Sequence, residues 1–389
     1  MKQLKIKTMP TPLSNFSSAS FLILCSLLLF ACGGEKAPPV SGAEQARVQQ
    51  KFEWKMVTSW PKNFPGLGRA PETFANYVEK MSGGRLSIKV YGAGELVPGF
   101  EVFDAVSQGT VQMGHAAAYY WKGKAPAAQI FTAIPFGMNA QEMNGWFHYG
   151  GGIELWREVY EPFGLIPFAG GNTGVQLAGW FKKEINSLED IKGLKMRIPG
   201  LGGEVFKKLG GLPVALTGGE LFTSLQSGAI DATEWVGPYN DLAFGFYKAA
   251  DYYYYSGWHE PGAALEFTVN KAAFASLPDD LQAIIEVATR AVNQDMLDEY
   301  TARNNEAMEA LLNKHGVDMR PLPPDVMDGL RQASMEVMQE QAAADPMFNK
   351  VYSSYKKFQD GVSRYHQISE VEYYKNRSAG DDLENQSKK

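Results

Sequence analysis

The chain has 389 residues, a length typical of two or three domains. Hydrophobic residues make up 45% and aromatic residues 12%, which supports a large packed core and excludes a generally disordered protein. The formal net charge is −6 and no long basic block is present, which argues against nucleic acid as a partner.

The N-terminus predicts export from the cytoplasm. A lysine-containing start precedes an apolar run from Phe21 to Ala31. This run is shorter than the about 20 apolar residues that a membrane-spanning helix needs. We therefore expect residues 1–31 to be a signal peptide.

Cys32 is expected to carry a lipid anchor. The sequence Leu29-Phe30-Ala31-Cys32 resembles a lipobox, and the alternative is a plain signal peptide in which Cys32 has no role. Residues 32–51 would then form a flexible tether. Because Cys25 and Cys32 are the only cysteines, the mature chain would have neither a disulfide nor thiol chemistry.

The first predicted elements alternate between strand and helix. Strands at 52–60, 86–90 and 111–116 are separated by helices at 71–81 and 98–108. This order predicts parallel strands with helices on the faces of the sheet.

A second alternating stretch follows, and it gives way to a helical C-terminal third. The predicted elements are a helix at 141–160, strands at 165–169 and 175–181, a capping box at Ser187, a strand at 194–198, a glycine turn at 200–203, helices at 204–209 and 220–226, strands at 229–235, 252–255 and 265–269, and helical segments at 277–314, 325–343 and 346–371. The tail from Asn376 is polar and is predicted to be disordered.

The ends of two predicted strands carry charged and aromatic groups. Arg197 stands at the end of the strand at 194–198, and Glu234 and Trp235 stand at the end of the strand at 229–235. Strand ends deliver ligand-binding groups in α/β proteins, so this set predicts a pocket for a small anion. The glycines at 200–203 do not have the spacing of a nucleotide-binding loop.

Gln176 and Glu260 extend this set. Gln176 interrupts the predicted strand at 175–181, and Glu260 lies in a loop rich in Gly, Trp and Pro. Alone, each is more typical of an outward-facing polar residue. With Glu234, they offer two carboxylates and an amide oxygen, which suit Na⁺ or Ca²⁺ rather than zinc. Arg197 suits a planar carboxylate.

Catalysis has weak support in the sequence. None of the five histidines has triad or metal-type spacing, and the Gly-x-Ser-x-Gly motif is absent. We predict that the chain is not an enzyme. An exported metal-dependent enzyme acting on a carboxylic acid is the alternative from another class.

Three segments carry a family resemblance: 171–181, 194–204 and 227–238. The third of them reads Ser-Gly-Ala-Ile-Asp-Ala-Thr-Glu-Trp-Val-Gly-Pro. They resemble the solute-binding proteins of tripartite ATP-independent periplasmic (TRAP) transporters, and most of all the subgroup that binds 2-oxo acids together with a metal ion. Residues 59–63 and 94–98 also fit this subgroup.

The resemblance implies an α/β, two-lobed periplasmic-binding-protein-like fold with a ligand cleft between the lobes and a helical C-terminal region. The implied divisions are a first lobe of 52–172 with about 257–300, a second lobe of 173–256 with about 301–343, a long C-terminal helix of 344–375 and a polar tail of 376–389.

The resemblance also implies roles for individual residues. Arg197 would clamp the ligand carboxylate, while Gln176, Glu234, Glu260 and a backbone oxygen of Trp235 would hold Na⁺ or Ca²⁺. The implied substrate-binding residues are Arg197, Gln176, Trp235, Tyr119, Tyr120, Trp60 and Asn63. The implied ligand is a pyruvate-like 2-oxo monocarboxylate. The alternatives are a 2-hydroxy acid such as lactate, a dicarboxylate or a sugar acid.

The implied partners follow from the same resemblance. The receptor would deliver its organic acid to the small and large TRAP membrane subunits. It would work in the periplasm as a lipoprotein anchored at Cys32, and a homodimer through the C-terminal helix is a further expectation.

Overall fold

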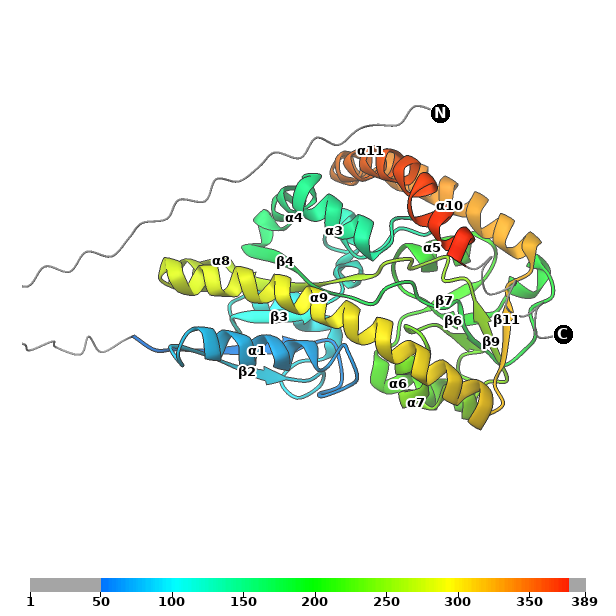
Figure 1. Cartoon of the computed structure of the whole chain (residues 1–389), viewed down its shortest axis with the longest axis horizontal. Coiled ribbons are helices and arrows are strands. Elements are labelled where there is room, and N and C mark those ends of the chain that lie inside the picture. The colour runs from blue at the N-terminus through cyan, green and yellow to red at the C-terminus, as the bar shows by residue number, and fades with distance from the viewer. Residues whose placement is uncertain (1–49, 378–389) are drawn as a thin grey trace, which may run out of the picture. The chain divides into compact units, whose positions relative to one another are not determined.

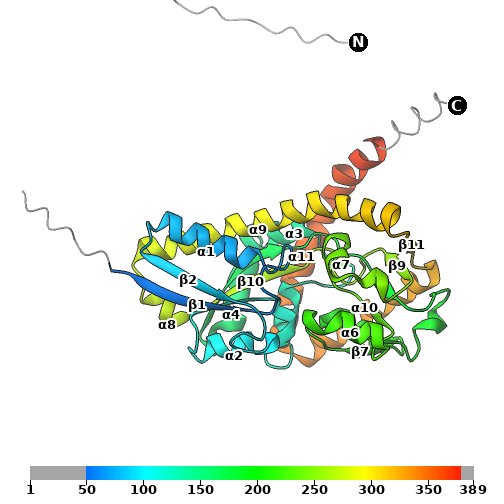
Figure 2. The same cartoon turned by 90° about the horizontal axis from the view of Figure 1, so that it is seen from below.

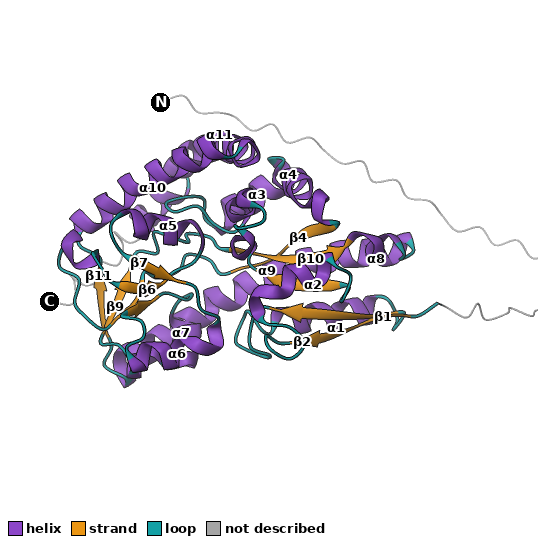
Figure 3. Cartoon of the chain, turned by 180° about the vertical axis from the view of Figure 1, so that it is seen from behind, coloured by secondary structure: helices purple, strands orange, loops and turns teal. Residues whose placement is uncertain are grey.

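The computed structural model describes residues 50–377. The predicted signal peptide, Cys32 and most of the predicted tail lie outside the described residues. Within 50–377 the chain forms two β-sheets surrounded by helices, as Figure 3 shows with strands in orange. This arrangement confirms the predicted α/β class. None of the helices in this part combines the length and the apolar character that a membrane span requires.

The first sheet has the strand order β2-β1-β3-β10-β4. Its strands are Phe52–Thr58 (β1), Leu86–Tyr91 (β2), Met113–Ala116 (β3), Leu165–Asn172 (β4) and Ala264–Asn270 (β10). As predicted, β1 pairs in parallel with β2 and β3. The late strand β10 runs antiparallel between β3 and β4 and completes the sheet of the first lobe.

The second sheet has the order β11-β9-β5-β8-β6-β7 and forms the second lobe. Its strands are Gly179–Phe181 (β5), Lys195–Arg197 (β6), Leu212–Val214 (β7), Ala232–Thr233 (β8), Tyr252–Tyr255 (β9) and Asp318–Pro321 (β11). The sequence did not predict β7 or β11. Neither strand alternates between buried and exposed residues, so neither has the period of two that identifies a half-buried strand.

Helices cover both sheets, and helices also form most of the C-terminal part of the described chain, as Figures 1 and 2 show from two directions. They are Ala70–Met81 (α1), Val102–Ser107 (α2), Ala140–Tyr149 (α3), Gly152–Tyr160 (α4), Gly200–Lys208 (α5), Gly218–Ser227 (α6), Pro238–Phe244 (α7), Lys271–Ala275 (α8), Asp279–Glu309 (α9), Pro324–Ala344 (α10) and Pro346–Ile368 (α11).

One helix belongs to both lobes. The 31-residue α9, yellow in Figure 1, packs against β4 and α1 of the first lobe and against α7 of the second. It continues into a π-helical turn, Ala310–Lys314. After it, α10 packs on α5, while α11 packs on α10 and on α3 and α4. The predicted helical third is therefore confirmed, apart from β11.

Three local predictions were wrong. The helix predicted at 141–160 is two helices, because Gly151 adopts a left-handed conformation with φ of 84° and starts α4. The glycine turn at 200–203 is the first turn of α5. A Cβ at Gly203 would lie 2.5 Å from the Ile198 carbonyl oxygen, so glycine allows the helix to begin this close to β6.

The third correction concerns Gln176, which does not lie in a strand. The Gln176 amide donates to the Glu260 carbonyl at 3.1 Å, and the Leu177 amide donates to the Val236 carbonyl at 3.0 Å. These bonds tie the segment before β5 to two loops rather than to a strand ladder. The strand therefore begins only at Gly179.

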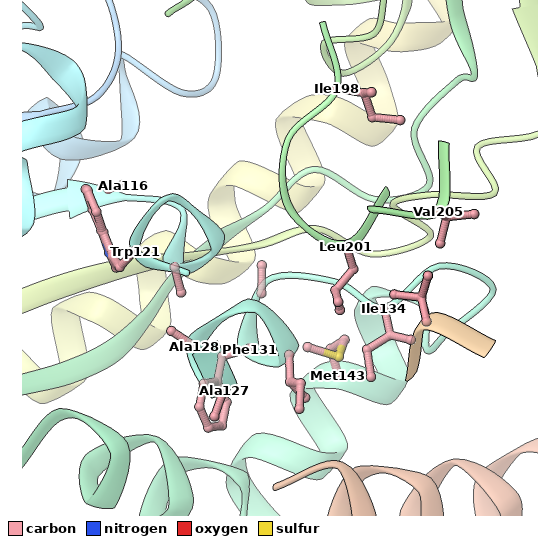
Figure 4. Close-up of a cluster of buried hydrophobic side chains, with 14 of the residues drawn as sticks. Ala116, Trp121, Ala127, Ala128, Phe131, Ile134, Met143, Ile198, Leu201 and Val205 are labelled. Atoms are coloured by element: carbon pink, nitrogen blue, oxygen red, sulfur yellow. The ribbon is translucent and has the colours of Figure 1, made fainter. Parts of the chain in front are cut away.

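Apolar packing links α5 to elements of the first lobe. Figure 4 shows Leu201 of α5 near Ile134 and Met143, with Val205 of the same helix farther along the cluster. All four side chains belong to one buried cluster, in which Phe131 stacks between two tryptophans of α3 and α4 at ring distances of 5.6 and 4.9 Å. This packing holds α5 against the first lobe.

Candidate functional site

A small cavity lies where the two lobes meet, and residues of both line it. The lining consists of Trp60, Leu67, Tyr119, Tyr120, Thr173, Gln176, Arg197, Trp235, Val236, Glu260, Ala263 and Leu265. These residues lie at or after the ends of β1, β3, β4, β6 and β8, or at or before the start of β10. The cavity thus occupies the crevice beyond strand ends in which α/β proteins bind small ligands.

Arg197, the last residue of β6, is the fixed cation of the cavity. Its Nη1 pairs with the Glu234 carboxylate, its Nε donates to the Leu216 carbonyl at 3.3 Å, and its Nη2 donates to the Tyr120 hydroxyl at 3.4 Å. The guanidinium also lies 4.9 Å from the Trp235 ring centroid, within cation–π range. Burial alone would lower the pKa of Arg197, but the Glu234 carboxylate, together with Tyr120, Tyr119 and Glu260, more than offsets this and raises it. Arg197 is therefore charged at any physiological pH.

Glu234 follows β8 directly and is fully buried. One carboxylate oxygen pairs with Arg197, and the other lies 3.3 Å from Nε2 of His259. The pairing of β6 with β8, which sets Arg197 opposite Thr233, brings these side chains together. Glu234 is thus held by two basic groups.

Glu260 and Gln176 form a second buried pair. Gln176 Nε2 donates to Glu260 Oε2 at 2.7 Å and to the Thr173 hydroxyl at 3.2 Å. Burial, followed by the nearby Glu234 charge, raises the pKa of Glu260 well above its usual range. Gly257 permits the close approach of the two loops, because a Cβ there would lie 1.9 Å from the Gln176 carbonyl oxygen.

These side chains fit a hard cation. One ligand atom from each of Glu234, His259 and Glu260 can be chosen so that all three lie within 4.8 Å of one another. Gln176 Oε1 is buried and has no hydrogen-bond partner among the described residues. Two carboxylates and an amide oxygen are donors that Ca²⁺ and Na⁺ prefer over softer ligands.

The predicted wall residues divide into two groups. The Trp60 indole donates to His115 Nδ1 at 2.7 Å and meets the Trp235 ring edge-on at 6.1 Å, and Tyr119 and Tyr120 lie in the short helix that follows β3. All three line the cavity. Asn63 is exposed in a loop with φ of 58° and is not among the lining residues.

His259, Thr173 and His115 also belong to this site or support it, although they were not predicted as site residues. His259 precedes Glu260 and Thr173 lies three residues before Gln176, so proximity in sequence was the available signal. His115 gives no such signal, because it lies within β3 and acts only through its contact with Trp60.

A second, larger cavity adjoins the first through Tyr119 and Tyr120. Its other walls are mostly apolar and include Phe100, Ile198 and Pro213. At its rim Lys122 of the first lobe forms an ion pair with Glu204 of α5 at 2.5 Å. This ion pair spans the two lobes beside the site.

Comparison with known proteins places the chain in a family. The model of the family "Bacterial extracellular solute-binding protein, family 7" matches residues 56–345. The monocarboxylate 2-oxoacid-binding periplasmic protein of Nostoc sp. is 45% identical over 320 residues, which cover 82% of this chain and 87% of that relative.

Two solved structures have the same fold. A TRAP periplasmic solute-binding protein from Colwellia psychrerythraea, with bound calcium and pyruvate, is 46% identical with a TM-score of 0.82 and covers 84% of this chain and 100% of its own. One from Pseudoalteromonas atlantica T6c, with bound sodium and pyruvate, is 45% identical with a TM-score of 0.82 and covers 84% and 99%. They confirm the predicted two-lobed fold. This chain belongs to the family-7 bacterial extracellular solute-binding proteins, the receptors of TRAP transporters.

Proposed function

We propose that this receptor captures a small 2-oxo monocarboxylate such as pyruvate together with Ca²⁺ or Na⁺. The observation that carries the proposal is a buried arginine, Arg197, beside an oxygen-rich set formed by Gln176, Glu234 and Glu260. The relatives solved with pyruvate and calcium or sodium support it.

The proposed roles follow from the charges of the side chains. Arg197 holds the ligand carboxylate through its planar guanidinium. Gln176, Glu234 and Glu260 hold the cation together with the backbone oxygen of Trp235. When bound, the cation supplies a positive charge that attracts the 2-oxo oxygen. Two glutamates and a ligand carboxylate outnumber Arg197, so a divalent ion balances the site better than a monovalent one.

The aromatic wall gives the site its size limit. Trp60, Tyr119 and Tyr120 surround the polar groups, and their contacts hold the rings in place: Tyr119 and Tyr120 meet edge-on at 4.8 Å. A buried pocket of this kind suits a short acid. The pocket disfavours a dicarboxylate, because the second carboxylate would lie near Glu260 or against aromatic rings and would have no positively charged partner.

Isothermal titration calorimetry tests the proposal. Purified protein is titrated with pyruvate, lactate and succinate in buffer containing Ca²⁺, Na⁺ or neither. We expect pyruvate to bind most tightly, and only weakly without either cation. Tighter binding of lactate or succinate than of pyruvate would contradict the proposed ligand class. Unchanged pyruvate affinity without Ca²⁺ and Na⁺ would contradict the proposed cation site.

We also propose that the receptor works in the periplasm and hands its ligand to the small and large TRAP membrane subunits, with a lipid anchor at Cys32. Labelling with a radioactive fatty acid tests the anchor, since Cys32→Ser should abolish incorporation.

Tyr365 and Ile368 of α11 are 63% and 77% exposed, which supports a homodimer through this helix. Sedimentation of the Ile368→Glu variant tests the dimer. The lobe boundaries inferred from the sequence remain part of this proposal.

A further inference from the structure

The ion pair between Arg197 and Glu234 joins the two groups that the ligand and the cation need. Arg197 is 1% exposed and Glu234 is 0% exposed, so bulk solvent does not screen the pair. Glu234 contacts Nη1 through its carboxylate, and its own carbonyl oxygen lies 3.4 Å from the same nitrogen. Glu234, which is proposed to bind the metal cation, is therefore paired with Arg197, which is proposed to bind the ligand carboxylate.

Every nitrogen of the Arg197 guanidinium has a partner. Nε donates to the Leu216 carbonyl, Nη1 to Glu234 and Nη2 to the Tyr120 hydroxyl. Among the described residues, Glu234 is the only carboxylate that forms an ion pair with Arg197. A ligand carboxylate that accepts two hydrogen bonds from the guanidinium must displace at least one of these partners. Glu234 is the partner that, like the ligand, carries a negative charge, so the two anions compete for the same cation.

Neither the ligand nor the cation gains much by entering alone. A ligand carboxylate that displaces Glu234 leaves a buried anion without its counter-ion, and a cation that takes Glu234 leaves Arg197 without one. Breaking a buried ion pair by removing one partner is strongly unfavourable. When both enter, each charge finds an opposite charge, because Arg197 pairs with the ligand and Glu234 pairs with the cation.

We propose that Glu234 competes with the ligand for Arg197, in addition to its role as a cation ligand. Cation binding draws Glu234 away from the guanidinium and makes Arg197 available to the ligand carboxylate. This inference rests on the proposed function, and it makes the affinity for the acid depend on the cation through one named side chain.

Glu260 provides the matched control. It is also a buried carboxylate of the cation set, but it is hydrogen-bonded to Gln176, and the described residues show no hydrogen bond or ion pair between it and Arg197. Replacing either glutamate by glutamine keeps the shape and exchanges a negatively charged cation ligand for a neutral amide oxygen. Only Glu234→Gln also removes the competitor from Arg197.

The experiment measures pyruvate affinity for the wild type, Glu234→Gln and Glu260→Gln, each in a chelator-treated, Na⁺-free buffer and at saturating Ca²⁺. In the wild type, we expect Ca²⁺ to raise pyruvate affinity about 10- to 100-fold, and pyruvate to raise Ca²⁺ affinity by the same factor. Glu234→Gln should bind pyruvate about 10-fold more tightly than the wild type without Ca²⁺, and should lose most of the response to Ca²⁺. Glu260→Gln should lose the response without that gain.

The outcomes separate the inference from the proposed function. If folded Glu234→Gln binds pyruvate no better than the wild type in the Ca²⁺-free buffer, the competition is overturned. An equal gain in Glu260→Gln would also overturn it, because removal of a negative charge alone would then explain the effect. Absence of pyruvate binding by the wild type at saturating Ca²⁺ would overturn the proposed function instead.

If Glu234→Gln does not fold, Arg197→Gln tests the same competition from the other side. Without pyruvate, this variant should bind Ca²⁺ more tightly than the wild type, because the arginine no longer holds Glu234. Unchanged or weaker Ca²⁺ binding by folded Arg197→Gln would contradict the competition.

Discussion

Each charged side chain of the site is fixed by another buried group. Arg197 contacts Glu234 and Tyr120, and Glu260 is held by Gln176. Such contacts order the side chains before a ligand arrives, so little conformational entropy is lost when they exchange partners on binding. The consequence at this scale is that single substitutions should act strongly and selectively.

Arg197→Ala should weaken pyruvate binding by about 2–5 kcal/mol, because the ligand carboxylate loses its buried partner. Calorimetry at saturating Ca²⁺ measures the loss. Lys195→Ala is the matched control, since Lys195 lies two residues earlier on β6 and is exposed. Affinity like that of the wild type in Arg197→Ala would contradict the assignment of Arg197.

Glu266 gives a pH-dependent stability that is separate from the site. It lies on β10 and accepts hydrogen bonds from the Trp121 indole at 2.6 Å and the Tyr160 hydroxyl at 2.7 Å. Burial raises its pKa from 4.5 to about 7, although these two hydrogen bonds oppose the shift. Between these values the native state holds a proton that the unfolded chain has lost.

The contribution of Glu266 to the free energy of unfolding should therefore fall as the pH rises from 4.5 to about 7 and should level off above this interval. From pH 5 to pH 8 the wild type should lose about 3 kcal/mol relative to Glu266→Gln, which has no such proton. Urea unfolding at the two pH values measures the difference, with Glu53→Gln as an exposed control on β1. Parallel pH profiles of wild type and Glu266→Gln would refute this prediction.

Among the elements, α11 depends on a few buried anchors. The Tyr355 hydroxyl accepts a hydrogen bond of 2.6 Å from the backbone amide of Met138, and His366 Nδ1 lies 2.7 Å from a Glu142 carboxylate oxygen of α3. These contacts fix the C-terminal helix to the first lobe, more than 200 residues away in sequence.

Tyr355→Phe should destabilise the protein by about 1–3 kcal/mol, because the buried Met138 amide loses its acceptor. Chemical unfolding at constant pH measures the loss. Tyr365→Phe on the same helix should change stability little, since Tyr365 is 63% exposed. Equal effects of the two substitutions would show that the Tyr355 hydroxyl has no special role.

The sequence predicted long elements better than short ones. The pattern identified α1 and the three long C-terminal helices because each extends over at least three turns. The strand predicted at 229–235 is real but contains only the two residues of β8, which are too few to set its bounds by any period. Gln176 was placed in a strand because its neighbours are apolar, but hydrogen bonds to distant loops decide its conformation.

Motifs singled out most of the residues that line the cavity with polar or aromatic groups, whereas the pairing of Arg197 with Glu234 was not predicted. Arg197 and Glu234 were assigned to different ligands, the carboxylate and the cation. The register of β6 on β8 brings them into contact, and a register between strands separated by more than 30 residues leaves no local trace in the sequence.

For the whole molecule, polar contacts join the two lobes. Lys122 pairs with Glu204 across the lobes, and Asn240 Nδ2 donates to the Pro65 carbonyl of the first lobe at 3.0 Å. Closure that is stabilised by ligand is the usual behaviour of two-lobed binding proteins. Contacts of this kind should act on ligand release more than on capture.

Glu204→Gln should speed pyruvate release by up to about fivefold, because an exposed ion pair contributes up to about 1 kcal/mol. Stopped-flow displacement of bound pyruvate measures the rate. Glu189→Gln is the control, since Glu189 pairs with Lys192 three residues away within one lobe. Equal release rates for the wild type and Glu204→Gln would exclude a role of this ion pair in holding the lobes together.

The position of β10 also governs the order in which the protein can fold as it is made. This strand lies between β3 and β4, yet it follows β3 by about 150 residues. Until Ala264–Asn270 has been synthesised, β3 and β4 each have an unpaired edge, and such edges pair readily with other chains. The first lobe, although it begins the described chain, is thus completed only after most of the second, and fragments that end before residue 264 should aggregate rather than fold.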